Sequence, residues 1–185
     1  MEIYKFQKHD VNFINKVVLI RVDFNVPLEK SEDSYYITDH TRINESIPTI
    51  KQVIDKNPRL IILISHLGRP KGKHDNSLSL FPIKNYLSLK LNKKISFLTQ
   101  YYPLTDLSKF SGIVMLENIR FLNEEEHFLI NNNLSQYLSK YTDIYINDAF
   151  GCSHRNHTSI VGVNSENRLA GKLLMKEISN LSPIL

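Results

Sequence analysis

Polar and apolar residues follow one another along the chain in blocks whose spacing changes from block to block. Short, continuous aliphatic runs rich in β-branched residues predict strands buried on both faces of a sheet. These runs lie at 17–22, 60–64, 112–116 and 143–146, with shorter ones at 95–98 and near 160–163. Elsewhere apolar residues recur every three or four positions, which predicts helices. We expect the helices at about 42–56, 80–91, from 124 to before 141, and at 170–178.

The helix predicted at 42–56 carries isoleucines at helical spacing, namely Ile43, Ile47, Ile50 and Ile54. Asp39 or Thr41 is placed to cap its first turn. Pro48 lies inside the pattern and lacks an amide hydrogen, so we expect a kink there or a late helix start. The preceding polar stretch, 29–36, is typical of a surface hairpin or loop.

Strand and helix alternate throughout, without an internal repeat or a low-complexity segment. This order predicts an α/β fold, with a parallel, Rossmann-like sheet and helices on both of its faces. A length of 185 residues favours one domain, 1–185, and is enough to bury a core without disulfides. The hydrophobic content of 42% and the charged content of 23% are those of an ordinary globular protein.

Cysteine content and charge narrow the expected cellular location and the expected class of ligand. Cys152 is the one cysteine, so no intrachain disulfide can form, and we expect a reducing, cytoplasmic location. The first residues are polar and charged, unlike a signal peptide, and no apolar run is long enough to span a membrane. A net charge of +4 suits an anionic ligand, whereas the dispersed lysines argue against nucleic acid as a partner.

Arginine is scarce and unevenly placed. The chain has sixteen lysines but seven arginines, and Arg69, Arg120 and Arg155 lie just after runs that predict buried strands. Arg42 opens the helix predicted at 42–56. The planar guanidinium grips phosphate or carboxylate with two N–H groups at once, which lysine cannot do. Because loops after parallel strands meet at one edge of the sheet, the four arginines predict a site for a small, highly anionic ligand.

Other polar residues near these strand ends have two interpretations each. His66 and Arg69, with glycines at 68 and 72, form either a ligand-binding loop or a basic surface turn. Asp23 and Asn25 can fix hydroxyl groups of a ligand or form an ordinary Asx turn. Arg120 can bind a ligand or pair internally, with Glu117 or with the acidic run 124–126. That run we expect to be a solvated helix start.

Common nucleotide and metal motifs are missing from the sequence. It contains neither a Gly-x-x-x-x-Gly-Lys-Ser/Thr loop nor a Gly-x-Gly-x-x-Gly motif. Cys152 lies close to His154 and His157, which raises the question of a metal or a cysteine nucleophile. One cysteine and two closely spaced histidines are a weak zinc pattern, and nothing else supports a nucleophile, so we expect neither.

Five blocks of the chain together point to one enzyme family. They are 21–27 (RVDFNVP), 39–43 (DHTRI), 65–72 (SHLGRPKG), 116–121 (LENIRF) and 147–155 (NDAFGCSHR). In order and in spacing they closely resemble phosphoglycerate kinase, and the similarity runs almost from end to end. The resemblance implies the N-terminal half of that fold. It would be a single 3-phosphoglycerate-binding domain that ends in an interdomain helix at about 170–180.

The resemblance also implies roles for individual residues. It implies a 3-phosphoglycerate site made of Asp23, Asn25, Arg42, His66, Arg69, Arg120 and Arg155. The arginines and His66 would form a basic patch for the ligand phosphate, and Asp23 and Asn25 would address the glycerate. Arg42 would be catalytic, stabilising the phosphoryl group in flight between ATP and the ligand carboxylate. In reverse, the site would accept 1,3-bisphosphoglycerate for transfer to ADP.

The family enzyme has a second, C-terminal domain that carries the nucleotide site, and its features do not occur in these 185 residues. We therefore expect Mg-ATP or Mg-ADP as the family's cofactor without a site for it in this chain, and the other domain as a partner in cis or in trans. Smaller departures from the family are Cys152-Ser153 in place of two small residues, an altered segment 99–104, and a short segment 126–141. None of them removes a site residue.

These observations predict a member of the glycolytic phosphoglycerate kinase family that binds 3-phosphoglycerate and is inactive alone. Two alternatives stay open: a stand-alone sensor or binding module for phosphorylated metabolites, and one half of a split kinase. Apolar residues near the end of the sequence bear on the choice, because unmatched apolar surface tends to mark a partner. They are Leu173, Leu174, Ile178, Leu181, Ile184 and Leu185.

Overall fold

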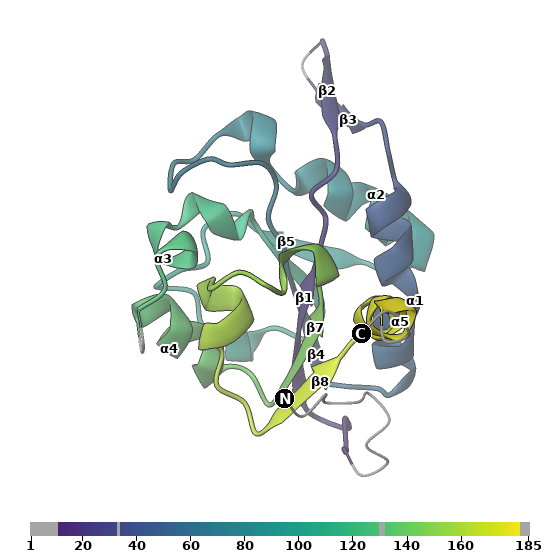
Figure 1. The fold of residues 1–185 in the computed structure, drawn as a ribbon, viewed down its shortest axis with the longest axis vertical. Coiled ribbons are helices and arrows are strands. Elements are labelled where there is room, and N and C mark those ends of the chain that lie inside the picture. The colour runs from purple at the N-terminus through teal and green to yellow at the C-terminus, as the bar shows by residue number, and fades with distance from the viewer. Residues whose placement is uncertain (1–10, 33, 130–131, 182–185) are drawn as a thin grey trace.

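The computed structural model describes residues 11–32, 34–129 and 132–181. Its centre is a sheet of six parallel strands in the order β5-β6-β4-β1-β7-β8 (Figure 1). The strands are β1 (Val17–Val22), β4 (Leu60–Ile64), β5 (Ile95–Leu98), β6 (Gly112–Leu116), β7 (Ile144–Asp148) and β8 (Asn167–Ala170). The predicted α/β fold with a parallel sheet is confirmed.

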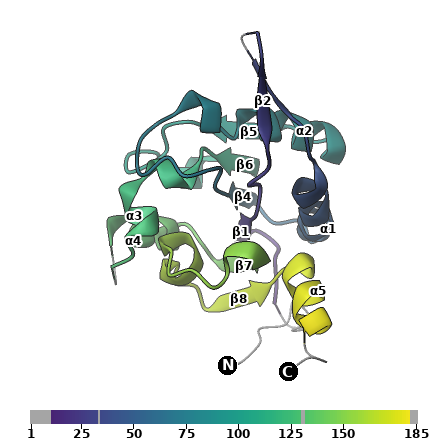
Figure 2. The same cartoon turned by 45° about the horizontal axis from the view of Figure 1, so that its top comes forward.

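Helices cover both faces of the sheet, as Figures 1 and 2 show. On one side lie α1 (Thr41–Asp55), α2 (Phe81–Leu91) and α5 (Lys172–Leu181), and on the other α3 (Asn123–Glu126) and α4 (Asn133–Lys140). Strand β1 serves both layers, because successive side chains of a strand point to opposite faces. Val18, Ile20 and Val22 join the apolar cluster with α1 and α2, whereas Val17 and Leu19 join the cluster with α4.

The polar segment 29–36 takes the hairpin alternative. Strands β2 (Leu28–Ser31) and β3 (Ser34–Ile37) pair antiparallel and project from the body of the molecule (Figure 1). Helix α1 begins at Thr41, whose N–H donates to Asp39 Oδ1 at 2.8 Å, and it continues through Pro48. The late start that Pro48 suggested is therefore wrong.

The strand predicted near 160–163 is also wrong, because this segment forms a π-helical turn, Thr158–Gly162. One of its carbonyl oxygens accepts a hydrogen bond from a side chain and not from a neighbouring strand, since Arg168 Nη2 donates to Ile160 O at 2.8 Å. The sixth parallel strand is β8 instead. The sequence pattern missed it because it opens with the polar residues Asn167 and Arg168 and lies at an edge of the sheet.

The region predicted as one helix between 124 and 141 contains two, α3 and α4. Asn132 caps the second, since its Oδ1 accepts from the Ser135 N–H at 2.7 Å. The acidic run opens α3 as expected but is not solvated throughout. Glu125 is fully buried and accepts hydrogen bonds from the N–H and hydroxyl of Ser159, at 2.8 and 2.6 Å. The expected solvated helix start is therefore wrong for Glu125.

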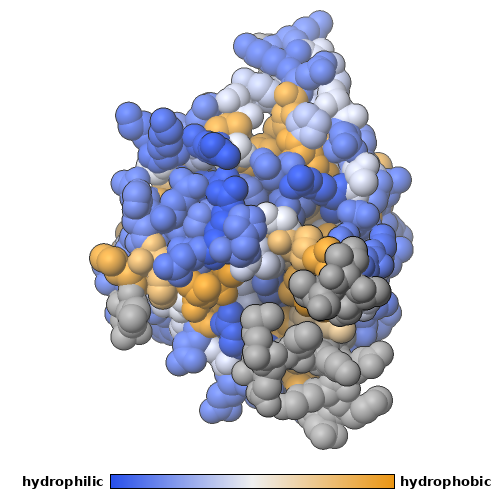
Figure 3. Space-filling view, in the orientation of Figure 1, coloured by the Kyte–Doolittle hydropathy of each residue, from blue (hydrophilic) through white to orange (hydrophobic). Residues whose placement is uncertain are grey.

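The last described helix, α5, begins two residues later than predicted and packs beside α1. Of the apolar residues noted near the end of the sequence, Leu173 is buried and Leu181 is exposed. Ile184 and Leu185 lie outside the described residues. The surface in Figure 3 is mostly hydrophilic, with smaller hydrophobic areas between polar side chains. Among the described residues, every helix is too short or too polar to cross a membrane.

Candidate functional site

The predicted site residues lie beyond the carboxyl ends of neighbouring strands. Asp23 follows β1, His66 follows β4, Arg120 follows β6, and Arg155 lies in the loop after β7. Following the chain, β4 lies beside β1 and β5 at the far edge on that side, β6 then enters between β4 and β5, and β7 and β8 follow on the other side of β1. Ligands of open α/β sheets bind where the strand order reverses in this way.

Asp23 forms the Asx turn that its position suggested and, in addition, an ion pair with Arg42. Its Oδ1 accepts from the Asn25 N–H at 3.2 Å, which closes an Asx turn. Its Oδ2 accepts from Arg42 Nη1 at 2.7 Å, so that helix α1 is tied to the end of β1. The Asp23 side chain is nearly buried, whereas that of Arg42 is 51% exposed. Arg42 therefore keeps further N–H groups directed to solvent.

Asn25 fixes the loop that follows β4. Its Oδ1 accepts from the Gly68 N–H at 2.9 Å. Gly68 has a φ of +60°, a conformation that glycine adopts without strain. Arg69 comes next and is exposed, and its guanidinium makes no hydrogen bond or ion pair with the described residues. The half-buried Arg155 is equally without such a partner among them.

Arg120 is partly used within the fold. Its Nη1 donates to Gly68 O at 2.7 Å, and its Nε lies 3.0 Å from Glu126 Oε1. The predicted internal pairing thus involves the acidic run and not Glu117, which instead accepts from Ser79 and the Leu80 N–H. Burial lowers the pKa of Arg120, and its Nη2 has no hydrogen-bond partner within the described chain. A buried charged donor therefore remains without an acceptor at this edge, among the described residues.

His66 is buried beside these arginines. Its Nδ1 lies 3.1 Å from Arg21 Nη2. Burial is the main factor that lowers the pKa of His66 far below its ordinary value, and the charges of Arg21 and Arg120 add to it. The imidazole is consequently neutral at physiological pH.

Arg21 is the site residue that sequence reasoning missed, although it stood in the first family block. It is fully buried, and its Nε donates to Ser159 Oγ at 2.8 Å. Ser159 in turn donates to Glu125, so its hydroxyl links the buried guanidinium of Arg21 to a buried carboxyl group. The signal was present in the sequence, because an arginine within the apolar run 17–22 must find buried partners.

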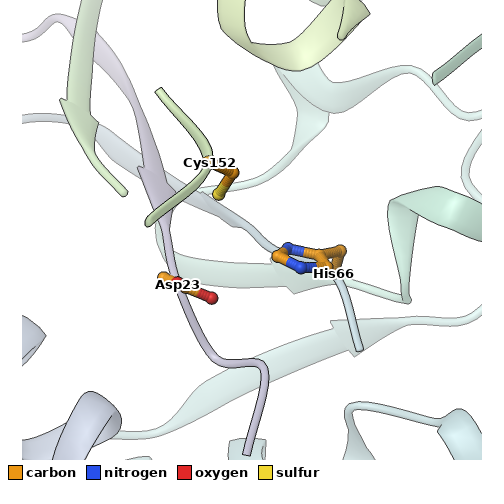
Figure 4. A group of neighbouring side chains, drawn as sticks. All are labelled: Asp23, His66 and Cys152. Atoms are coloured by element: carbon orange, nitrogen blue, oxygen red, sulfur yellow. The ribbon is translucent and has the colours of Figure 1, made fainter. Parts of the chain in front are cut away.

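Asp23, His66 and Cys152 come together in the site (Figure 4), and all three are buried. Their ligand atoms lie within 4.8 Å of one another, which raises the metal question again. The chemistry is unfavourable for a cation. Asp23 is bound to Arg42, Arg21 faces His66 Nδ1, and burial raises the pKa of the Cys152 thiol. Deprotonated thiolate and free imidazole nitrogen are what a metal such as zinc requires.

The cysteine nucleophile considered from the sequence has no support in the geometry. Cys152 is buried, His154 is exposed, and no hydrogen bond joins their side chains in the described part of the chain. What surrounds Asp23 and His66 is a set of guanidinium groups from several elements of the fold. Such a set attracts an anion with several oxygens.

Comparison with known proteins agrees with this geometry. The family model described as phosphoglycerate kinase matches residues 8–185. The phosphoglycerate kinase of Wolinella succinogenes is 43% identical over 181 residues, and that of Helicobacter pylori strain J99 is 45% identical over 179 residues. These alignments cover 95% and 94% of this chain but 44% and 42% of the relatives' own lengths.

Solved structures give the same result. The phosphoglycerate kinase structure from Coxiella burnetii superposes with a TM-score of 0.82 at 34% identity, covering 96% of this chain and 44% of that one. The structure from Pyrococcus horikoshii superposes with a TM-score of 0.79 at 25% identity, covering 97% and 45%. The 185 residues thus span a little under half the length of these relatives. By its match to the family model over nearly its whole length, the chain belongs to the phosphoglycerate kinase family.

Proposed function

We propose that this chain binds 3-phosphoglycerate as the substrate-binding half of a phosphoglycerate kinase. The observation that carries the proposal is the grouping of partnerless cationic donors at one edge of the sheet. Arg120 keeps a buried N–H group without an acceptor, and Arg69 and Arg155 have no partner among the described residues. Because a buried donor without an acceptor is costly, this edge fits a ligand with several negatively charged oxygens.

In the proposed complex, His66 and the arginines Arg69, Arg120 and Arg155 hold the phosphate of the ligand. Asp23 and Asn25, which shape the loops after β1 and β4, address its glycerate part. Arg42 is held close by Asp23 while its outer N–H groups stay exposed. That position suits a residue that neutralises a phosphoryl group passing from ATP to the carboxylate oxygen of the ligand.

We further propose that the nucleotide is held by another part of the protein, in cis or in trans. Mg-ATP or Mg-ADP supplies or accepts the phosphoryl group when bound there. Phosphoryl transfer depends on positioning both reactants and neutralising charge between them. A chain that binds one reactant alone is therefore expected to be inactive.

Titration calorimetry with 3-phosphoglycerate tests the binding proposal. We expect the wild-type chain to bind and Arg69→Ala to weaken binding at least tenfold, since a hydrogen bond to a charged group contributes about 1.5 to 3 kcal/mol. Arg59→Ala is the matched control, because it removes the same charge at the other end of β4. Equal losses in both variants, or no binding by the folded wild type, would overturn the proposal.

A coupled assay separates the kinase reading from its alternatives. We expect no turnover of 3-phosphoglycerate and Mg-ATP by the purified chain. Turnover that appears when a separately expressed nucleotide-binding half is added would indicate a split kinase. Binding of 3-phosphoglycerate with no turnover under either condition would favour a sensor module.

A further inference from the structure

Arg21 cannot touch a ligand directly, yet it contacts a residue that we propose does. It is fully buried in β1, on the same face of the strand as Val17 and Leu19, which pack with residues of α4. Its Nε is bound by Ser159 and its Nη2 lies 3.1 Å from His66 Nδ1, and neither atom reaches solvent. A hydrogen-bonded route from Arg21 to a bound anion therefore passes through His66.

The contact between Arg21 and His66 determines where the imidazole carries its proton. A guanidinium group has donors only, so the atom that faces it must accept. Nδ1 of His66 is that atom, which leaves the single proton of the neutral ring on Nε2. His66 then presents an N–H donor from the side of the ring that Arg21 does not face.

The charges around His66 also disfavour a second proton on the ring. Arg21 faces it from β1, Arg120 from the turn after β6, and Arg155 and His157 from the loop after β7. Asp23 and Cys152 are its other titratable neighbours. The Asp23 carboxylate is already engaged by Arg42, and the Cys152 thiol is protonated because burial raises its pKa. Among these described neighbours, no free anion is left to stabilise an imidazolium.

Arg21 is connected through Ser159 to a buried acidic residue, Glu125. Glu125 is buried and accepts two hydrogen bonds from Ser159, whose hydroxyl accepts from Arg21 Nε. This chain of contacts fixes the guanidinium in place without placing an acid against His66. The arrangement supplies a positive charge beside the imidazole and withholds the negative one that would raise its pKa.

We propose that Arg21 is a positioning residue that holds the proton of the buried, neutral His66 ring on Nε2, so that the imidazole serves as a pH-independent hydrogen-bond donor to the bound anion. This inference rests on the proposed function of the site. A neutral donor adds no further repulsion among the neighbouring arginines. Binding through it requires no proton uptake by the protein between about pH 5 and 8, where a free histidine would titrate.

Nitrogen-15 NMR of the wild-type chain, without any ligand, tests the first half of the proposal. We expect His66, assigned by comparison with His66→Gln, to show the Nε2–H tautomer and no titration between about pH 5 and 8. A proton on Nδ1, or a titration near the ordinary histidine value, would overturn it. This measurement stands even if the chain binds no 3-phosphoglycerate, so it separates failure of the inference from failure of the proposed function.

Calorimetry of 3-phosphoglycerate across the same pH range tests the second half. In Arg21→Met burial still keeps the pKa of His66 low, so we expect the ring to stay neutral, the Nδ1–H tautomer to appear, and the affinity to fall at least threefold relative to wild type across this pH range. Comparing the two proteins at each pH cancels the titration of the ligand's own phosphate. A loss of affinity while His66 keeps its proton wholly on Nε2 would mean a merely structural role and would refute the proposal.

Ser159→Ala keeps the test decisive if Arg21→Met does not fold. It removes one hydrogen bond to Arg21 and leaves the Ser159 backbone N–H bonded to Glu125. We expect a smaller change in the same direction, in both the His66 tautomer and the affinity for 3-phosphoglycerate. An unaltered His66 spectrum in Ser159→Ala, with Arg21→Met unfolded, would count against the proposed chain of contacts.

Discussion

Arginine is used in different ways at the two ends of the parallel strands, which we call the amino edge and the carboxyl edge of the sheet. At the amino edge Arg59 precedes β4, and its Nη1 donates to the carbonyl oxygens of Ser108 and Phe110, at 2.9 and 3.1 Å. At the carboxyl edge Arg69 follows the same strand and has no partner among the described residues. One arginine ties down a loop, while the other is left to solvent or a ligand. Position along the strand, more than residue type, separates an arginine used within the fold from one that we propose binds a ligand.

Other polar groups at the amino edge also find partners within the fold. The Val17 N–H donates to Asp143 Oδ2 at 2.8 Å, and Lys16 lies 4.0 Å from the other oxygen of that carboxylate. At the carboxyl edge, by contrast, the buried donor Arg120 Nη2 has no hydrogen-bond partner in the part of the chain that the structure describes. These polar groups of the amino edge have partners within the fold, whereas the carboxyl edge keeps a buried donor without an acceptor among the described residues. We propose that a ligand binds at the carboxyl edge.

Exchanging an arginine at each edge tests this contrast most strongly. Arg120→Met should weaken 3-phosphoglycerate binding about thirtyfold to hundredfold, because it removes a charged donor worth about 2 to 3 kcal/mol. Arg59→Met should leave the Kd within about twofold and lower only stability. Calorimetric Kd values and urea unfolding of both variants supply the measurements. The contrast fails if the two variants weaken binding alike.

Asp148, at the end of β7, is expected to make the stability of the fold depend on pH. Its Oδ1 accepts from the Leu173 N–H at 2.9 Å, but its Oδ2 has no partner in the described chain, and burial raises its pKa to about 6 from an ordinary 3.8. Folding therefore favours the protonated form. The stabilisation is present below about pH 4 and is lost as the pH rises through 6, by up to about 3 kcal/mol.

The variant Asp148→Asn cannot ionise and isolates this effect. We expect its free energy of unfolding, relative to wild type, to increase by up to about 3 kcal/mol between pH 4 and 7. Urea denaturation of both proteins at several pH values measures the difference. A difference that stays constant across that range would show that Asp148 keeps an ordinary pKa in the fold.

Gly68→Ala tests how tightly the loop after β4 must be held. The φ of +60° strains alanine, and the added Cβ would lie 2.7 Å from Leu78 Cδ2, a side-chain end that can shift. We expect a loss of stability of about 1 to 2 kcal/mol, and weaker ligand binding because Arg120 donates to Gly68 O. Thermal unfolding and calorimetry report the two effects. Unchanged values of both would show that the loop adapts freely.

The smallest effect is expected at the amino edge. Lys16→Met removes an exposed ion pair whose side chains are 46% and 45% accessible. Such pairs contribute between zero and about 1 kcal/mol, so we expect a stability change below about 0.5 kcal/mol and an unaltered Kd. A clear loss of ligand affinity in this variant would mean that charge anywhere on the surface, and not the placement of arginine, governs binding.

Local pattern was enough to predict most of the fold. Strands β1, β4, β5, β6 and β7 were expected because they lie in short, mostly apolar runs, and the helices because apolar residues recur at helical spacing. The pattern failed at β8, where an edge strand carries Arg168 over the ring of Tyr145, 4.2 Å from its centre. It failed again at Thr158–Gly162, where side chains satisfy the backbone carbonyls. In both places contacts between distant residues override local preference.

The sequence by itself determined which residues stand at strand ends, the family they resemble and the anionic character of the expected ligand. These depend on residue type and spacing, which are local. Only the tertiary structure decided the partners of the charged groups: Arg21 reaches His66 across 45 positions of sequence, and Glu125 reaches Ser159 across 34. Pairing in a buried site depends on distances that folding creates, and burial then sets which groups can stay charged. The buried support of His66 therefore became visible only in the fold.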